Sequence, residues 1–169
     1  MKGFSIVKRA FEALCRDDWE LLLVDNTLNL GFSSVDAADW RVRGKLRVVP
    51  SYTQDGLDAF FADIDVLLFP SQWKESFGLT VREALARDVW VIATDGGGPG
   101  EAIAENINGN LIPLDGRHEH LQSAVENLLA HPARLANYRN PLAGQIIDFD
   151  SQAQALRATL KRVAQENLA

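Results

Sequence analysis

The chain has 169 residues, with 17 Lys and Arg against 23 Asp and Glu, a net charge of −6 and 47% hydrophobic residues. A chain of this size can bury a substantial core as one domain without disulfides. The acidic balance and the lack of a basic stripe exclude a typical nucleic-acid-binding protein. No apolar run reaches the roughly 20 residues of a membrane span, and the N-terminus has no signal-peptide pattern. The sequence therefore predicts a cytoplasmic protein.

The single cysteine, Cys15, cannot close an intrachain disulfide, and we expect it on a helix face. Apolar spacing predicts that helix over residues 4–14, and the run Leu21–Val24 predicts a strand buried on both faces. Further strands are expected at 46–49, 65–69 and 90–93, with helices at 57–62 and 80–87 between them. Residues 26–43 predict no element. Apolar strands separated by helices indicate an α/β, Rossmann-like three-layer sandwich with a parallel sheet.

The C-terminal segment is almost wholly helical from Arg117 onward, with breaks near residues 131–132 and 140–141. A final helix carries the stripe Leu156, Leu160 and Val163, which we expect to pack rather than to bind a partner. His118 and His120 lie two positions apart on a helix and so point in different directions. We therefore expect surface histidines and no metal site.

The most informative segment follows the strand at 65–69, where ligands bind in parallel sheets. A helix beginning near Gly78 would point free N–H groups at an anion such as a phosphate. Glu75 precedes that helix and Glu83 follows eight residues later, so both carboxylates could border one pocket. Carboxylates repel phosphate but accept hydrogen bonds from hydroxyl groups. A nucleotide sugar offers both kinds of group.

A second loop, residues 96–100, reads Gly-Gly-Gly-Pro-Gly and follows the strand at 90–93. Its backbone N–H groups could cradle a phosphate, or the run could be a flexible turn. It does not match the G-x-G-x-x-G fingerprint of dinucleotide-binding domains. Trp73 is either a cover over a sugar or an exposed aromatic side chain of the loop.

Taken in order, these motifs resemble the retaining, family-four (group 1) glycosyltransferases of the GT-B fold. The resemblance covers Lys2 to about Leu129 and rests on Lys2-Gly3, the Glu75-x7-Glu83 pair, the loop 97–101 and the segment 108–112. It implies that residues 1–169 are one nucleotide-sugar-binding domain, the C-terminal half of a GT-B enzyme. The N-terminal acceptor-binding domain would be missing.

The resemblance also implies roles for individual residues. Glu83 would hold the ribose hydroxyls and Glu75 the hydroxyls of the transferred sugar, while Lys2 would neutralise the departing diphosphate. Glu75 and Lys2 are thus the candidate catalytic residues. Backbone groups of the remaining candidate residues would receive the donor: Phe77, Gly78, Leu79, Thr80, Gly97 and Gly98.

The implied reaction moves a hexosyl group from a nucleoside-diphosphate sugar to a saccharide, lipid or small-molecule acceptor. Transfer in this family retains the anomeric configuration and needs no metal or other cofactor, so protein cations and N–H dipoles meet the charge of the leaving group. The loop at 49–52 would face the base. Any membrane association would occur through the missing domain, and this domain alone should bind a donor without transferring its sugar.

Two departures from the family pattern keep other functions open. Asp25-Asn26-Thr27 stands where the family has a Gly-x-Gly turn, and Asp88-Val89-Trp90 stands where it has Gly-x-Pro. One alternative is a non-catalytic nucleotide-binding or interaction module that has lost its chemistry. The other is one half of a GT-B-like nucleotide-sugar epimerase or phosphorylase.

Overall fold

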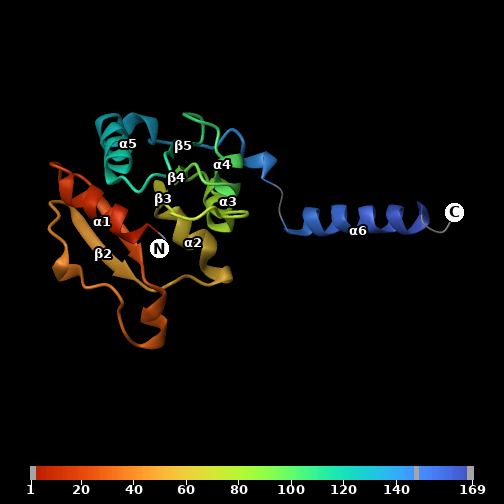
Figure 1. Cartoon of the computed structure of the whole chain (residues 1–169), viewed down its shortest axis with the longest axis horizontal. Helices are drawn as coiled ribbons and strands as arrows, with labels where there is room; N and C mark the ends of the chain where they lie inside the picture. The colour runs from red at the N-terminus through yellow and green to blue at the C-terminus, as the bar shows by residue number, and fades with distance from the viewer. Residues whose placement is uncertain (1–2, 147–148, 167–169) are drawn as a thin grey trace.

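A computed structural model describes residues 3–146 and 149–166 of the chain (Figure 1). Its helices and strands are α1 Phe4–Ala13, β1 Glu20–Val24, β2 Lys45–Val49, α2 Leu57–Ala62, β3 Val66–Phe69, α3 Leu79–Leu85, β4 Trp90–Thr94, α4 Gly98–Glu101, β5 Gly109–Ile112, α5 His118–Ala130 and α6 Phe149–Glu166. The predicted order of helices and strands is confirmed from α1 to β4. The short helix α4 was not expected, because the run at 96–100 was interpreted as a loop. Residues 26–43, for which no element was expected, contain two short 3-10 helices, Asn26–Leu30 and Ala37–Asp39.

All five strands run parallel, but they form two sheets. β1 pairs with β2, with Leu21 opposite Leu46, and β3, β4 and β5 pair in that order, with Leu68 opposite Ile92. The parallel α/β fold is confirmed. The difference from the expectation is that the sheet is divided between β1 and β3.

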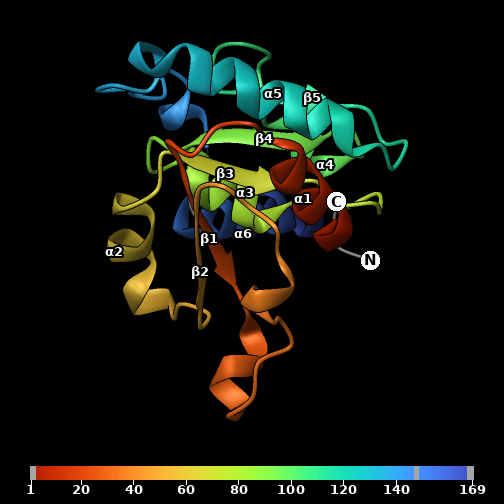
Figure 2. The ribbon, with the colours of Figure 1, turned by 90° about the vertical axis from the view of Figure 1, so that its left-hand side faces the viewer.

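Helices cover both faces of the strands (Figure 2). On one face, α1 and α5 bury a cluster that includes Ile6, Phe11, Leu21, Trp90, Ile92, Ile112 and Leu121. On the other face, α2 and α3 bury a second cluster that includes Leu57, Phe61, Val81, Leu85, Val91 and Ala93. β4 separates the two clusters and is buried along its whole length. Among the described helices, none is long and apolar enough to span a membrane.

The prediction of a doubly buried strand at Leu21–Val24 is wrong. Leu21 is buried, but Leu22 and Leu23 are half-buried and Val24 is 37% exposed. The reason is that β1 has a hydrogen-bonded neighbour on the β2 side alone.

Two further expectations, that Cys15 lies on a helix face and that the apolar stripe of the last helix is packed, are wrong. Cys15 is exposed and lies beyond α1, which ends at Ala13 when Leu14 turns to an extended conformation. The stripe Leu156, Leu160 and Val163 is exposed rather than packed, because α6 extends away from the layers of the domain (Figure 1).

The unusual sequence Asp88-Val89-Trp90 has a structural role. Asp88 adopts a left-handed conformation, with φ of 61°, that favours glycine but is tolerated by aspartate. Its carboxylate accepts a hydrogen bond from the backbone N–H of Asn140 at 2.8 Å. The buried side chain of Asn140 in turn donates to the carbonyl of Leu85 at 2.8 Å. This turn therefore ties the segment after α5 to the end of α3.

Candidate functional site

The carboxyl ends of β3 and β4 together hold the side chain of Glu75. Ser71, which is only 2% exposed, donates from Oγ to Glu75 Oε1 at 3.0 Å. The carbonyl of Ser71 accepts a hydrogen bond from Thr94 Oγ1 at 2.5 Å. Because Thr94 ends β4 and Ser71 follows β3, the Glu75 carboxylate is positioned by two neighbouring strands. Glu75 itself is half-buried and so remains accessible to a ligand.

The glycine-rich loop docks on the backbone of Glu75. The Glu75 N–H donates to the carbonyl of Gly96 at 3.0 Å, and the Gly98 N–H donates to the carbonyl of Glu75 at 2.8 Å. A Cβ atom at Gly97 would lie 2.5 Å from the Glu75 carbonyl oxygen, and one at Gly98 would lie 2.5 Å from that of Ser76. The close approach therefore requires glycine at both positions. The two loops singled out in the sequence lie side by side.

The amino end of α3 borders the same loops and faces solvent. Gly78 precedes the helix with φ of 70°, a left-handed conformation, and a Cβ there would lie 2.7 Å from Pro99 Cγ. Phe77 and Leu79, on either side, are 42% and 59% exposed. The first backbone N–H groups of a helix have no partner within the helix. The four residues 77–80 thus form an accessible rim beside Glu75 and the glycine loop.

Glu83 lies further along α3 and meets a residue from the loop after β2. Its carboxylate is half-buried, and the hydroxyl of Tyr52 approaches Glu83 Oε2 at 3.4 Å. Tyr52 packs on Phe60, with ring centroids 4.4 Å apart. Burial, followed by the negative charge of Glu83, raises the pKa of the Tyr52 hydroxyl. Tyr52 is therefore a neutral hydroxyl beside the second carboxylate, and the 49–52 loop lies next to Glu83.

Arg82 fastens the two loops to α3, a role that the sequence analysis did not assign. Its guanidinium donates to the carbonyls of Phe77 and Gly98, the second at 3.1 Å. It also stacks on the Phe77 ring, 3.9 Å from the centroid. The sequence signal for this role is the spacing of four residues between Gly78 and Arg82. In a helix, that spacing puts both residues on one face, and the side chain of the second tilts toward the helix start.

Of the Lys2-Gly3 motif at the start of the chain, the structure describes Gly3 alone. Lys2 lies outside the described residues. Gly3 is buried against Pro70, where a Cβ would lie 2.1 Å from the Pro70 carbonyl oxygen. The chain therefore enters α1 beside the loop that carries Ser71 and Glu75.

Asp25 organises the loop after β1, where the family pattern has glycines. It is 4% exposed, and its carboxylate accepts hydrogen bonds from Thr27, Ser33 and Ser34 at 2.7 to 3.0 Å. These bonds, led by the Thr27 hydroxyl, hold the pKa of Asp25 well below its ordinary value. The departure thus replaces a glycine turn with a charged, fully hydrogen-bonded centre, from which Leu30 and Phe32 project into solvent.

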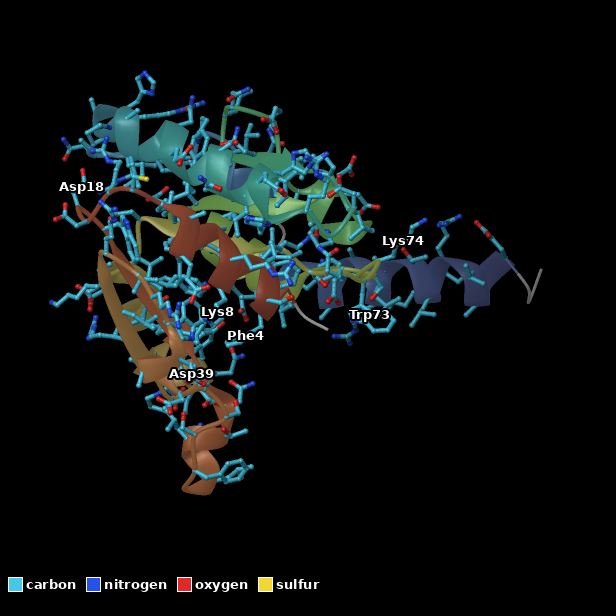
Figure 3. The ribbon with its side chains drawn as sticks, turned by 60° about the vertical axis from the view of Figure 1, so that its left-hand side comes forward. Phe4, Lys8, Asp18, Asp39, Trp73 and Lys74 are labelled. Carbon is cyan, nitrogen blue, oxygen red and sulfur yellow. The ribbon has the colours of Figure 1, made fainter. Side chains whose placement is uncertain are left out.

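The remaining candidates lie at the surface or serve local structure. Trp73 is 63% exposed and lies with Lys74 at the tip of the loop after β3 (Figure 3). His120 contacts Asp115 at 3.1 Å, whereas His118 contacts Glu119 at 3.4 Å, so the two rings do not converge. In the described parts of the chain, no three acidic, His or Cys side chains gather as a metal site would require.

This arrangement combines hydroxyl-binding and anion-binding groups on one edge of the strands. Glu75 and Glu83 supply acceptor oxygens, while residues 77–80 and Gly97 supply backbone amides. The N–H groups of Gly98 and Gly100 are bonded to the carbonyls of Glu75 and Gly97. The polar groups come from the loops after β2, β3 and β4 and from α3. Such a set can hold a phosphorylated, hydroxyl-rich ligand.

Comparison with known proteins gives the family. The family model described as "Glycosyl transferases group 1" matches residues 1–142. The chain belongs to the group 1 glycosyltransferases.

Two curated relatives are glycosyltransferases by name. A GDP-mannose-dependent alpha-mannosyltransferase of Mycolicibacterium smegmatis is 35% identical over 146 residues, which cover 81% of this chain and 35% of the relative. A D-inositol 3-phosphate glycosyltransferase of Rhodococcus opacus is 31% identical over 140 residues, covering 78% of this chain and 31% of the relative. The chain thus spans about a third of the length of these relatives.

Solved structures show the same fold at lower identity. HepE from Anabaena, solved in complex with UDP-glucose, superposes with a TM-score of 0.75 at 19% identity, covering 95% of this chain and 45% of that one. The C-terminal domain of LpcC, a group 1 family protein from Francisella tularensis, superposes with a TM-score of 0.62 at 19% identity, covering 86% of this chain and 77% of that one. The fold is that of a GT-B glycosyltransferase half.

Proposed function

We propose that residues 1–169 form the donor-binding domain of a retaining glycosyltransferase that transfers a hexosyl group from a nucleoside-diphosphate sugar. The observation that carries the proposal is the pairing of Glu75 with the glycine loop, next to the exposed start of α3. That pairing gathers a carboxylate and several backbone amides at one edge. The similarity to a solved C-terminal domain supports the choice of this half of the enzyme.

In the proposed complex, Glu83 accepts hydrogen bonds from the ribose diol and Glu75 from hydroxyls of the transferred sugar. Backbone N–H groups of residues 77–80 and of Gly97 receive the phosphates, while Gly98, whose N–H is bonded to the Glu75 carbonyl, keeps the loop close to the donor. Lys2 supplies a cation for the leaving diphosphate. These groups stabilise the charge that develops as the bond between the sugar and the phosphate breaks, which lowers the barrier without a metal.

The acceptor would bind to a second domain on the opposite side of the donor. Because positioning of the acceptor hydroxyl provides much of the rate, this domain alone should bind the donor without transferring the sugar. The acceptor class proposed is a saccharide, a lipid or a small molecule. A GDP-mannose-dependent relative and a UDP-glucose-bound structural neighbour point to nucleoside diphosphates of more than one base as trial ligands.

Calorimetric titration tests this proposal. The ligands are UDP, GDP and ADP and their hexose conjugates, titrated into the wild-type chain and into Glu83→Gln, which keeps the size of the side chain but loses one acceptor oxygen. Glu126→Gln, on the exposed face of α5, is the matched control. We expect a dissociation constant below about 1 mM for one nucleotide, weakened at least about tenfold by Glu83→Gln and unchanged by the control. Absence of binding by every nucleotide would favour a non-catalytic interaction module that has lost nucleotide binding.

A further inference from the structure

The Glu83 carboxylate meets a hydroxyl group rather than a cation. No ion pair formed by the described residues includes Glu83. Arg87, four residues further along the chain, pairs with Asp58 at 2.7 Å and donates to the backbone carbonyl of Glu83 at 3.1 Å. The hydroxyl of Tyr52 instead approaches the carboxylate, 3.4 Å from Oε2. The direction in which the Glu83 side chain points therefore depends on Tyr52.

Aromatic packing fixes the position of the Tyr52 hydroxyl. The Tyr52 ring packs on Phe60 and Phe61 of α2, with ring centroids 4.4 and 5.7 Å away. These two phenylalanines pack edge-to-face on each other at 5.3 Å, and Phe61 is only 1% exposed. Aromatic pairs prefer definite geometries. Tyr52 is thus anchored on the apolar cluster beneath α2 and α3, independently of its contact with Glu83.

The chemistry of the two groups decides which one donates. An ionised carboxylate only accepts hydrogen bonds. Tyr52 keeps its proton at neutral pH, because burial, followed by the charge of Glu83, raises the pKa of its hydroxyl. The phenol therefore donates to Glu83. An O–H···O bond usually measures about 2.7–2.8 Å, so at 3.4 Å the carboxylate can still move toward a ligand.

The two carboxylates of the candidate site are supported in the same way. Ser71, from the loop after β3, donates to one oxygen of Glu75 at 3.0 Å, just as Tyr52, from the loop after β2, approaches one oxygen of Glu83. Each carboxylate oxygen has two acceptor positions. Oε2 of Glu83 can therefore bind Tyr52 and one further hydroxyl, while Oε1 accepts another. Neighbouring hydroxyls on one ring, such as the 2′- and 3′-hydroxyls of ribose, match this pair of oxygens.

We propose that Tyr52 is a positioning residue for ribose: its hydroxyl orients the Glu83 carboxylate so that the site prefers ribonucleoside diphosphates to their 2′-deoxy forms. This inference rests on the proposed donor-binding function and adds selectivity for the sugar of the nucleotide. A 2′-deoxyribose leaves an acceptor position of a half-buried carboxylate without a donor, which weakens binding in a site built around hydrogen bonds. Without the phenol, the carboxylate is less well oriented, so the ribonucleotide loses its advantage.

Calorimetric titration of the full 169-residue chain tests the inference. The probes are whichever of UDP, GDP and ADP binds the wild type best, and the 2′-deoxy form of that nucleotide. We expect the wild type to prefer the ribonucleotide by at least about tenfold. In Tyr52→Phe, which keeps the ring, the preference should fall to about threefold or less. The loss should come from weaker ribonucleotide binding, with deoxyribonucleotide binding changed by less than about twofold.

The other tyrosine of the chain supplies a matched control. Tyr138→Phe also removes a donated hydrogen bond, which runs to the carbonyl of Ile107 at 3.1 Å. Tyr138 packs on Trp90, which begins β4 and so lies at the edge opposite the candidate site. Its substitution should leave the preference for the ribonucleotide unchanged. In the Glu83→Gln background, Tyr52→Phe should cause no further change in that preference, because Tyr52 acts through Glu83.

Other results would overturn the inference. If the wild type binds both nucleotides equally, or if Tyr52→Phe leaves the preference at the wild-type value, Tyr52 does not select ribose, although the donor-binding proposal stands. If the wild type binds no nucleotide, both proposals fail. Should Tyr52→Phe not fold, nuclear Overhauser contacts are measured on the wild type with the nucleotide bound. Contacts between the ribose protons and the Tyr52 ring then support the inference, and contacts of that ring with the base alone, or with no part of the nucleotide, overturn it.

Discussion

Adding one methyl group at Gly97 tests how closely the glycine loop packs against the backbone of Glu75. Gly97→Ala places a Cβ 2.5 Å from the Glu75 carbonyl oxygen at φ of 94° and ψ of −138°. Holding an L residue in such a backbone region costs roughly 1–3 kcal/mol, and overpacking costs about 1–3 kcal/mol. The free energy of unfolding should fall by roughly 4 kcal/mol, which for a chain of this size lowers the Tm by roughly 8–16 °C.

Three matched variants separate the two causes. Gly98→Ala meets the backbone of Ser76 at 2.5 Å without a left-handed φ, whereas Gly31→Ala has φ of 88° and nothing within 4 Å. Gly144→Ala has neither feature. We expect losses of about 1–3 kcal/mol for Gly98→Ala, about 1 kcal/mol for Gly31→Ala and less than about 0.5 kcal/mol for Gly144→Ala.

Thermal unfolding followed by circular dichroism, with urea unfolding as a check, measures the four variants. The reasoning is refuted if Gly98→Ala and Gly144→Ala unfold at the same temperature. In that case the glycine loop would not rest on residues 75–77, and the arrangement of the candidate site would be wrong.

Three further predictions concern single side chains. Asp25→Asn should lower the Tm at neutral pH. The difference in Tm between variant and wild type should narrow as the pH falls below about 4, because the lowered native pKa of Asp25 gives stability that is lost toward acid. A pH series of melting curves checks this. Arg82→Lys should cost about 1.5–3 kcal/mol in urea unfolding because lysine cannot span the carbonyls of Phe77 and Gly98, whereas exposed Arg9→Lys should cost nothing measurable. Ser71→Ala should weaken binding of a nucleotide sugar more than binding of the free nucleoside diphosphate in calorimetry, because it frees the Glu75 carboxylate; equal weakening would contradict that role.

The sequence predicted the elements whose signals are local. Prolines at positions 50 and 70 end β2 and β3, and apolar periodicity located α1 and α2. The sequence also placed the Glu75 loop and the glycine loop after strands of one parallel sheet, whose carboxyl ends share an edge. It did not predict that the backbones of the two loops pair.

Features that depend on distant contacts were missed. The burial of a strand depends on its neighbours, so the apolar run at Leu21–Val24 could not reveal that β1 lacks a partner on one side. The exposure of Leu156 and Leu160 depends on where α6 lies, and amphipathic spacing is the same for a packed helix and an extended one. The left-handed conformation of Asp88 and the hydrogen bonds from Arg82 to Phe77 and Gly98 likewise depend on tertiary contacts and leave no periodic signal in the sequence.

The most direct test of the central claim is to map nucleotide binding on the chain by amide chemical shifts. The donor that binds best in calorimetry is titrated into isotope-labelled protein. We predict shifts concentrated in residues 75–80 and 96–98 and around Tyr52 and Glu83, all at the carboxyl edge of the strands. Shifts confined to the opposite edge, such as the surface hollow lined by Asp17, Trp19 and Lys45, would contradict the account.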